Sequence, residues 1–319
     1  MIEASGLCMR YGDFAALEDA TFRAAKGEVV GLLGPNGAGK TTTMRILTTY
    51  LVPSSGRAIV AGFDVAAEPL EVRRRIGYLP EQLPLYLGLE VQECLRFVGR
   101  ARGLQGADLT RRIENVVEAC GLAEKFHAPV QTLSKGFRQR TGLAQALIHD
   151  PEVVILDEPT TGLDPHQILE IRALVKEIAR TKTVILSTHI LQEASALADR
   201  LVVMSAGRVV AQGTIPELFR DARLATTVRV GFDALPPDVA RILGEVRGAG
   251  EVTLRPDGRS MDVVETSDGL AARIGALAAE RRWALTELHR REASLEELFL
   301  ALTKRSGGHM HAPSQGAAA

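Results

Sequence analysis

The residues best suited to chemistry lie in one glycine-rich stretch, which reads Gly34-Pro35-Asn36-Gly37-Ala38-Gly39-Lys40-Thr41-Thr42. It fits the spacing G-x-x-x-x-G-K-[ST], in which N–H groups of the loop and of a following helix N-terminus point at phosphate oxygens. In that pattern Lys40 reaches the β- and γ-phosphates, and the Thr41 hydroxyl binds Mg²⁺. We therefore predict that all nine residues bind a nucleoside triphosphate, with Lys40 also acting in catalysis.

A second candidate is the pair of adjacent carboxylates in Val153-Val154-Ile155-Leu156-Asp157-Glu158. Four apolar residues predict a buried strand, and open α/β sheets bind ligands at the carboxyl ends of their strands. Asp157 is suited to hold Mg²⁺ through water, and Glu158 is suited to polarise an attacking water. The stretch therefore predicts a hydrolytic site.

The elements that must position these residues alternate between apolar strands and amphipathic helices, which predicts a largely parallel sheet covered on both sides. Residues 1–33 are expected to form short strands, residues 76–91 to be irregular because Pro80 and Pro84 exclude a long helix, and residues 92–122 to form a helical insert. The other expected elements are strands at 28–33, 57–62, 153–156 and 183–186, helices at 134–149 and after Pro165, and a hairpin at 200–213.

The character of the chain changes after about Ala222. The order strand, helix, strand, strand, helix, strand predicts a small ferredoxin-like α+β domain. A last helix is expected at Ser294-Leu295-Glu296-Glu297, where Ser294 and Glu297 form a capping box. We predict domains at 1–222 and 223–305, followed by a disordered tail at 306–319.

Composition narrows the class of protein. The 319 residues are 46% hydrophobic and carry a formal net charge of −1, which gives no general attraction to nucleic acid. Three cysteines lie far apart and are expected to be reduced thiols in a cytosolic protein. No apolar run approaches the roughly 18 residues that span a bilayer, so membrane-spanning helices are expected on another chain.

The glycine loop alone leaves kinases, GTPases, helicases and transport ATPases open, although the Asn-Lys-x-Asp motif of GTPases does not occur. Residues Leu133-Ser134-Lys135-Gly136-Phe137-Arg138-Gln139-Arg140 resemble the signature motif of the ATP-binding cassette (ABC) family. The resemblance covers about residues 2–215. It implies a P-loop cassette with a mixed-sheet core, an antiparallel β subdomain and a helical subdomain, and the cofactors ATP and Mg²⁺.

The resemblance also implies roles for single residues. Tyr11 matches the aromatic residue that stacks on adenine, Asp164 lies in the D-loop, and His189 matches the switch histidine that contacts the γ-phosphate. Ser134 and Gly136 would close over the ATP held by a second subunit, so the resemblance implies a homodimer that forms on ATP binding.

Two departures from the family pattern stand out. Lys135 and Phe137 replace the usual glycine and glutamine of the signature motif. In the Q-loop, Glu81 takes the usual glutamine position after Pro80, and Gln82 follows. Either side chain could reach Mg²⁺ or the attacking water, and the residues do not decide between them; Gln82 is carried as the candidate metal ligand.

The signature variant, the stretch Ser187–Glu193 and the C-terminal extension resemble cassettes that serve type-2 permeases, above all those associated with gliding motility and multidrug export. This implies an ATPase subunit of a bacterial exporter, cytoplasmic and peripheral on the inner membrane, with a separate permease and no nucleic acid partner. The alternative is a soluble cassette ATPase acting on ribosomes or DNA, which usually has two cassettes in one chain or a long coiled coil. A nucleotide-binding regulator without turnover would conflict with an intact Glu158.

Overall fold

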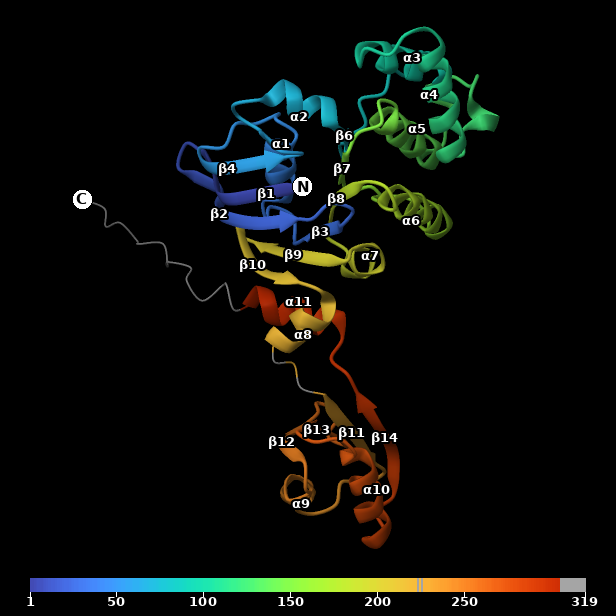
Figure 1. Ribbon diagram of the computed structural model, residues 1–319. Helices are drawn as coiled ribbons and strands as arrows, with labels where there is room; N and C mark the ends of the chain where they lie inside the picture. The colour runs from blue at the N-terminus through green and yellow to red at the C-terminus, as the bar shows by residue number, and fades with distance from the viewer. Residues whose placement is uncertain (223, 225, 305–319) are drawn as a thin grey trace, which may run out of the picture. The chain divides into compact units, whose positions relative to one another are not determined.

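The computed structural model describes residues 1–222, residue 224 and residues 226–304. They form two compact units, each of which is described by itself: the first contains residues 1–215 and 302–304, and the second contains Pro216–Ala301 (Figure 1). The predicted domain limits at 222 and 305 stay predictions. The tail predicted to be disordered, 306–319, lies outside the described residues.

A six-stranded sheet forms the centre of the first unit (Figure 1). Its five parallel strands are joined at one edge by an antiparallel sixth, so the predicted mixed sheet is confirmed. In spatial order the strands are β10 (Arg208–Gly213), β9 (Arg200–Ser205), β3 (Val29–Leu33), β8 (Thr183–Thr188), β7 (Val153–Asp157) and β6 (Ile76–Leu79).

Strand β7 shows why this sheet is covered on both faces. Successive side chains of a strand point to opposite faces. Val153 and Ile155 accordingly join one hydrophobic core, which also contains apolar residues of helix α1 (Lys40–Leu47). Val154 and Leu156 join the other core, together with helix α6 (Pro165–Ala179). An unbroken apolar run is therefore required to bury this strand.

A separate antiparallel sheet packs on the α1 side of the first core. Turns separate its first two strands from each other and from β3, but these strands have 10 and 11 residues rather than the short lengths expected. In spatial order the sheet contains β2 (Phe14–Ala24), β1 (Ile2–Tyr11), β4 (Ser55–Val60) and β5 (Phe63–Asp64).

The predicted helical insert is confirmed, and its helices share the second core with α6. Figure 1 shows α3, α4 and α5 grouped together beyond the edge strand β6. The elements of this region are α3 (Val91–Ala101), α4 (Gly106–Ala119), the 3₁₀ turns Ala123–Lys125 and Val130–Thr132, and α5 (Lys135–Leu147). Helix α7 (Leu191–Leu197) follows β8.

The expectation that residues 76–91 are irregular was wrong at its start, because Ile76–Leu79 is strand β6, paired in parallel with β7. Pro80 and Pro84 were the reason for expecting an irregular run, but both lie after the strand. In the fold, a Cβ at Gly77 would lie 3.0 Å from the carbonyl carbon of Ala146 in α5. Glycine is thus needed for close packing of strand and helix. Helix α2 (Pro69–Arg75), just before β6, was also not expected.

The second unit contains the predicted βαββαβ order. Its antiparallel sheet has the spatial order β12-β13-β11-β14, so the first strand lies between the third and the fourth, as in ferredoxin-like folds. Ser294 and Glu297 form the predicted capping box. The elements are α8 (Ile215–Ala222), β11 (Thr227–Phe232), α9 (Val239–Gly244), β12 (Ala249–Leu254), β13 (Ser260–Glu265), α10 (Leu270–Glu280), β14 (Leu285–Arg291) and α11 (Leu295–Lys304).

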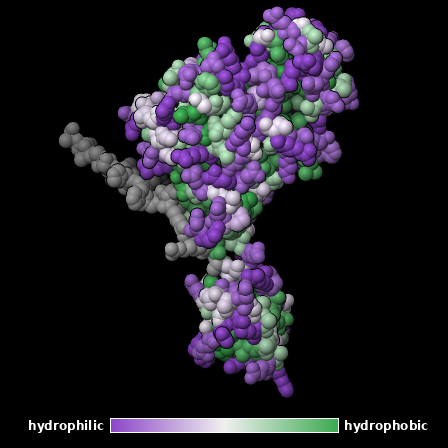
Figure 2. Space-filling view, viewed as in Figure 1, coloured by the Kyte–Doolittle hydropathy of each residue, from purple (hydrophilic) through white to green (hydrophobic). Residues whose placement is uncertain are grey.

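The described surface is largely hydrophilic on the face drawn in Figure 2, with apolar residues in small groups. Within the described ranges, no helix combines the length and the hydropathy needed to cross a membrane.

Candidate functional site

The glycine loop joins β3 to α1, as its spacing predicts. Gly39 is the N-cap of α1 and has a φ of 100°, a left-handed conformation that favours glycine. The loop then leads directly into Lys40, whose Nζ donates to the backbone oxygens of Gly34 at 2.7 Å and Pro35 at 3.3 Å. The side chain of Lys40 therefore folds back over the glycine loop, and backbone oxygens of the loop hold its ammonium group.

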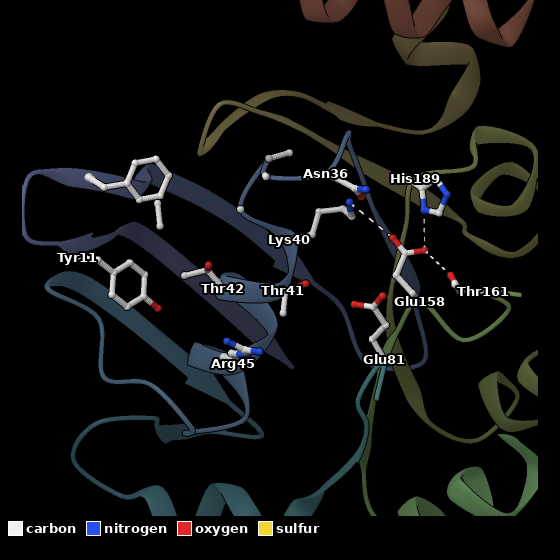
Figure 3. A pocket seen from close by; sticks show the side chains of 15 residues that line it. Tyr11, Asn36, Lys40, Thr41, Thr42, Arg45, Glu81, Glu158, Thr161 and His189 are labelled. Atoms are coloured by element: carbon white, nitrogen blue, oxygen red, sulfur yellow. Dashed lines mark hydrogen bonds and ion pairs between the residues drawn. The ribbon is translucent and has the colours of Figure 1, made fainter. Parts of the chain in front are cut away.

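A pocket of about 480 Å³ lies over this loop and the start of α1. Its walls come from four places in the sequence: the β1–β2 hairpin, the glycine loop with α1, the segment after β6, and the segments after β7 and β8 (Figure 3). The lining residues are Tyr11, Phe14, Ala16, Asn36, Gly37, Ala38, Gly39, Lys40, Thr41, Thr42, Arg45, Glu81, Glu158, Thr161 and His189.

Glu158 contacts three other side chains of the pocket (Figure 3). It is 9% exposed, and its φ of 50° places it in a left-handed conformation directly after β7. Lys40 Nζ lies 3.7 Å from Oε1, His189 Nδ1 lies 2.9 Å from Oε2, and the Thr161 hydroxyl donates to Oε2 at 3.1 Å. The backbone turn thus brings a carboxylate, an ammonium and an imidazole to one point.

Asp157 lies behind Glu158 and is 1% exposed. Burial raises the pKa of its carboxyl above the ordinary value; the Ser187 hydroxyl, which donates to Oδ1 at 2.6 Å, works in the opposite direction. The negative charge of Glu158 raises this pKa further, and a hydrogen bond with Thr41 lowers it. A hydroxyl and a buried carboxylate therefore meet at the base of the pocket.

These two groups fit a magnesium ion. Mg²⁺ prefers oxygen ligands and usually takes one or two carboxylates together with substrate phosphates and water. The described ranges contain no group of three or more His, Cys, Asp or Glu side chains that could hold a metal by themselves. The Thr41–Asp157 pair suits an ion that arrives with a nucleotide.

The signature residues lie elsewhere in the same unit. Ser134 is the N-cap of α5, and its hydroxyl accepts from the Phe137 N–H at 3.4 Å. Asp164 caps α6 and accepts from the Gln167 N–H at 2.9 Å. A Cβ at Gly136 would lie 2.9 Å from the side chain of Gln167, so the two helix N-termini are packed together. Neither Ser134, Gly136 nor Asp164 lines the pocket of its own chain.

The structure separates the two Q-loop candidates, because Glu81 lines the pocket and Gln82 does not. Tyr11 also lines the pocket and is 48% exposed. Sequence reasoning missed the lining residues Phe14, Ala16, Arg45 and Thr161, and it missed Ser187. The position of Ser187, opposite Asp157 in the register of β7 and β8, could have indicated it.

Comparisons with known proteins agree with this arrangement. Residues 17–161 match the family described as ABC transporter. The chain is 36% identical to the Nod factor export ATP-binding protein I of Ralstonia nicotianae, over 96% of this chain and 94% of that protein. It is 39% identical to the daunorubicin resistance ATP-binding protein DrrA3 of Streptomyces coeruleorubidus, over 95% of each.

Among solved structures, the chain resembles a dimeric, post-hydrolysis state of the ATP-binding cassette MJ0796 bound to ADP and Pi. The TM-score is 0.61 and the identity 26%, over 67% of this chain and 99% of that one. Near-complete coverage of relatives more than 30% identical, together with the geometry of the pocket, identifies the protein class. The chain belongs to the ABC transporter family, as an ATP-binding cassette protein of the ATPase type.

Proposed function

We propose that this chain is the ATP-hydrolysing subunit of a bacterial exporter and drives transport through a separate transmembrane permease. The observation that carries the proposal is the position of Glu158, held between Lys40 and His189 in a pocket built on the glycine loop. A buried carboxylate at this place can accept a proton from water or orient it, which is the task of a catalytic base.

Different residues of the pocket bind different parts of ATP. The loop residues 36–42, which line the pocket, bind the phosphates through backbone N–H groups, and Lys40 contacts the β- and γ-phosphates. Tyr11, at the other side of the pocket in Figure 3, stacks on the adenine. His189 donates to the γ-phosphate, and Glu158 polarises the attacking water.

In the described structure, Lys40 and His189 both contact Glu158. An anionic γ-phosphate competes for the same two cationic or hydrogen-donating groups, since charge-assisted hydrogen bonds to phosphate are strong. Binding of ATP would therefore release the carboxylate of Glu158 toward water. Because of this exchange, Glu158 would act as a base only when a nucleotide is bound.

Thr41 and Asp157 are the proposed residues for Mg²⁺, and Glu81 is the proposed Q-loop contact. When bound, Mg²⁺ supplies positive charge against the β- and γ-phosphate oxygens. Gln82, also predicted to be a metal ligand, receives no support from its place outside the pocket lining.

A second copy of the chain completes the site in this proposal. Ser134 and Gly136 lie at an N-terminus of a 13-residue helix, where N–H groups and the helix dipole favour phosphate, yet they do not line their own chain's pocket. The solved relative MJ0796 is described as dimeric. We infer that two copies place Ser134, Gly136 and the D-loop residue Asp164 against each other's ATP, in a twofold arrangement.

The names of the relatives support export through a partner, since one belongs to Nod factor export and another to daunorubicin resistance. We propose type-2 permease chains as the partner and the cytoplasmic membrane surface as the place of action. The likeness to gliding-motility cassettes stays a prediction. The alternative, action on ribosomes or DNA, is not favoured by these relatives or by a net charge of −1.

The test is ATP hydrolysis by the purified chain with Mg²⁺. Replacing Glu158 with Gln keeps the shape but removes the base, and kcat is expected to fall by about 100-fold or more. Glu152→Gln is the matched control, because Glu152 is a half-exposed carboxylate just before the other end of β7. Its kcat should match that of the wild type.

Wild-type turnover by the Glu158→Gln variant would refute the catalytic assignment. The same variant should accumulate as an ATP-bound dimer in gel filtration, whereas a monomer at saturating ATP would count against the shared site. Co-purification with a membrane permease supports the exporter, and co-sedimentation with ribosomes would support the alternative.

A further inference from the structure

One buried polar pair lies beside the pocket and has no role in the proposed chemistry. The hydroxyl of Thr160 donates a hydrogen bond to Oε2 of Glu193. Thr160 is 3% exposed and Glu193 is 4% exposed. Neither residue lines the nucleotide pocket.

Burying the carboxylate of Glu193 at this position costs folding free energy. Removing a carboxylate from water is unfavourable unless it is well paired, and apolar side chains of similar volume often stabilise such a position better. Within the described ranges no ion pair links Glu193 to a basic side chain. Its place in the first turn of α7 gives some compensation through the helix dipole. The pair therefore calls for an explanation beyond packing.

The pair joins the two segments that carry the proposed catalytic groups. Strands β7 and β8 are parallel neighbours, with Asp157 opposite Ser187. Thr160 follows Glu158 by two residues on the segment after β7, and Glu193 follows His189 by four residues on the segment after β8. A hydrogen bond between them thus ties one segment to the other behind the pocket.

A second connection between the same segments lies at the pocket itself, where His189 Nδ1 contacts Glu158 Oε2 at 2.9 Å. His189 is 44% exposed in its side chain, so this front contact is accessible to a ligand. The proposed reaction breaks it, because His189 moves its hydrogen bond to the γ-phosphate. The buried Thr160–Glu193 bond then remains between the two segments, in addition to the Ser187 hydroxyl, which joins the ends of the strands themselves.

We propose that Glu193 is a positioning residue that acts through Thr160 to keep Glu158 and His189 in register during turnover. The Thr160–Glu193 bond holds the two segments at a constant spacing while the exposed His189–Glu158 contact opens and closes. Thr161 transmits this position to the base, since its hydroxyl donates to Glu158 Oε2 at 3.1 Å. The inference rests on the proposed hydrolytic function of the site.

The test compares Thr160→Val, which keeps the shape but loses the donor, with Thr160→Ser, which keeps the donor. We expect Thr160→Val to lower kcat about 10-fold or more, because a misplacement of about 1 Å can cost about 100-fold. The dissociation constant for ATP, measured without Mg²⁺, should change less than about threefold, since the pair does not touch the pocket. Thr160→Ser should restore kcat to within about twofold of the wild type.

Two further variants keep the test decisive. In Thr160→Val with Glu193→Gln, no buried carboxylate is left unpaired, so this double variant is expected to fold and to show the same loss of kcat. Thr183→Val is the matched control, because Thr183 is a buried threonine at the opposite end of β8 whose hydroxyl contacts backbone groups of Ala25 and Gly27. It should lower Tm without changing kcat.

The inference is overturned if Thr160→Val hydrolyses ATP like the wild type, or if Thr160→Ser is as slow as Thr160→Val. A parallel loss of kcat and ATP affinity in the folded double variant would also overturn it, since that pattern indicates a general structural role. Failure of the proposed function looks different: the wild-type chain would then lack Mg²⁺-dependent ATPase activity before any Thr160 variant is made.

Discussion

The substitution Ser187→Ala tests how the site is assembled, because one hydroxyl serves both carboxylate residues. Ser187 is fully buried at the end of β8. Its Oγ donates to Asp157 Oδ1 at 2.6 Å and accepts from the backbone N–H of Glu158 at 3.0 Å. Alanine removes the acceptor of one buried N–H and the donor of one buried carboxylate together.

The expected loss of folding free energy is about 1–3 kcal/mol, the usual range when a buried polar group is left unsatisfied. The effect of the substitution on kcat should be larger than its effect on stability. The N–H of Glu158 helps to hold this residue in its left-handed turn, and a displacement of about 1 Å can reduce kcat by about 100-fold. We therefore expect kcat to fall about 10-fold to 100-fold.

The pH dependence gives an independent readout. The hydrogen bond from Ser187 lowers the pKa of Asp157, so its loss raises that pKa further. A carboxylate that must be ionised to bind Mg²⁺ then binds it only at higher pH, so the acid limb of the hydrolysis rate at sub-saturating Mg²⁺ should move toward higher pH. The assay is the rate of ATP hydrolysis at sub-saturating Mg²⁺ from about pH 5 to pH 8, with Tm by calorimetry.

The control is Ser260→Ala, which removes the hydrogen bond from the buried hydroxyl of Ser260 to the exposed carboxylate of Asp257 in the second unit. It should lower stability and leave kcat and its pH profile unchanged. If Ser187→Ala retains wild-type kcat and the same acid limb, the reasoning that Ser187 positions both carboxylate residues is refuted.

Three further predictions follow from the same geometry. Asp157→Asn should raise Tm of the nucleotide-free protein near neutral pH, because burial raises the folded pKa of Asp157 and ionisation then destabilises the fold; the gain should vanish below about pH 4, where the carboxyl is protonated in both states, and an equal Tm at pH 7 would contradict it. Glu81→Ala should slow ATP hydrolysis more than Gln82→Ala, since Glu81 alone of the two lines the pocket; the reverse order in kcat would assign the role to Gln82. Gly77→Ala should cost about 1–3 kcal/mol in urea unfolding, because its methyl group meets the backbone of Ala146, and an unchanged midpoint would show that strand and helix can separate there.

Local sequence was sufficient for the parts of this protein that depend on short spacing. The glycine loop, the N-cap at Ser134 and the apolar run of β7 are encoded within a few residues of one another. Backbone conformation and hydrogen bonds over such distances follow from the residue types alone. The order of strands and helices in the second unit was predictable for the same reason.

Only the tertiary structure decided which segments of the chain are neighbours in the sheet. Ile76–Leu79 is a strand because β7 is next to it, although Pro80 and Pro84 led to the prediction of an irregular segment. Which of Glu81 and Gln82 lines the pocket likewise depends on which way the chain leaves that strand. Pairing of distant segments depends on register and packing, which local propensity does not contain.

Around the carboxylates of Asp157 and Glu158, too, local sequence indicated some of the residues and only the tertiary structure showed the others. Sequence spacing indicated Asp157 and Glu158 as the chemical residues, each from its place at the end of an apolar run. Ser187, which contacts Asp157 and the N–H of Glu158, is an ordinary polar residue whose importance arises when parallel β7 and β8 bring their ends together. The sequence therefore determined which chemistry is possible, and the register of two neighbouring strands decided which side chains hold that chemistry in place.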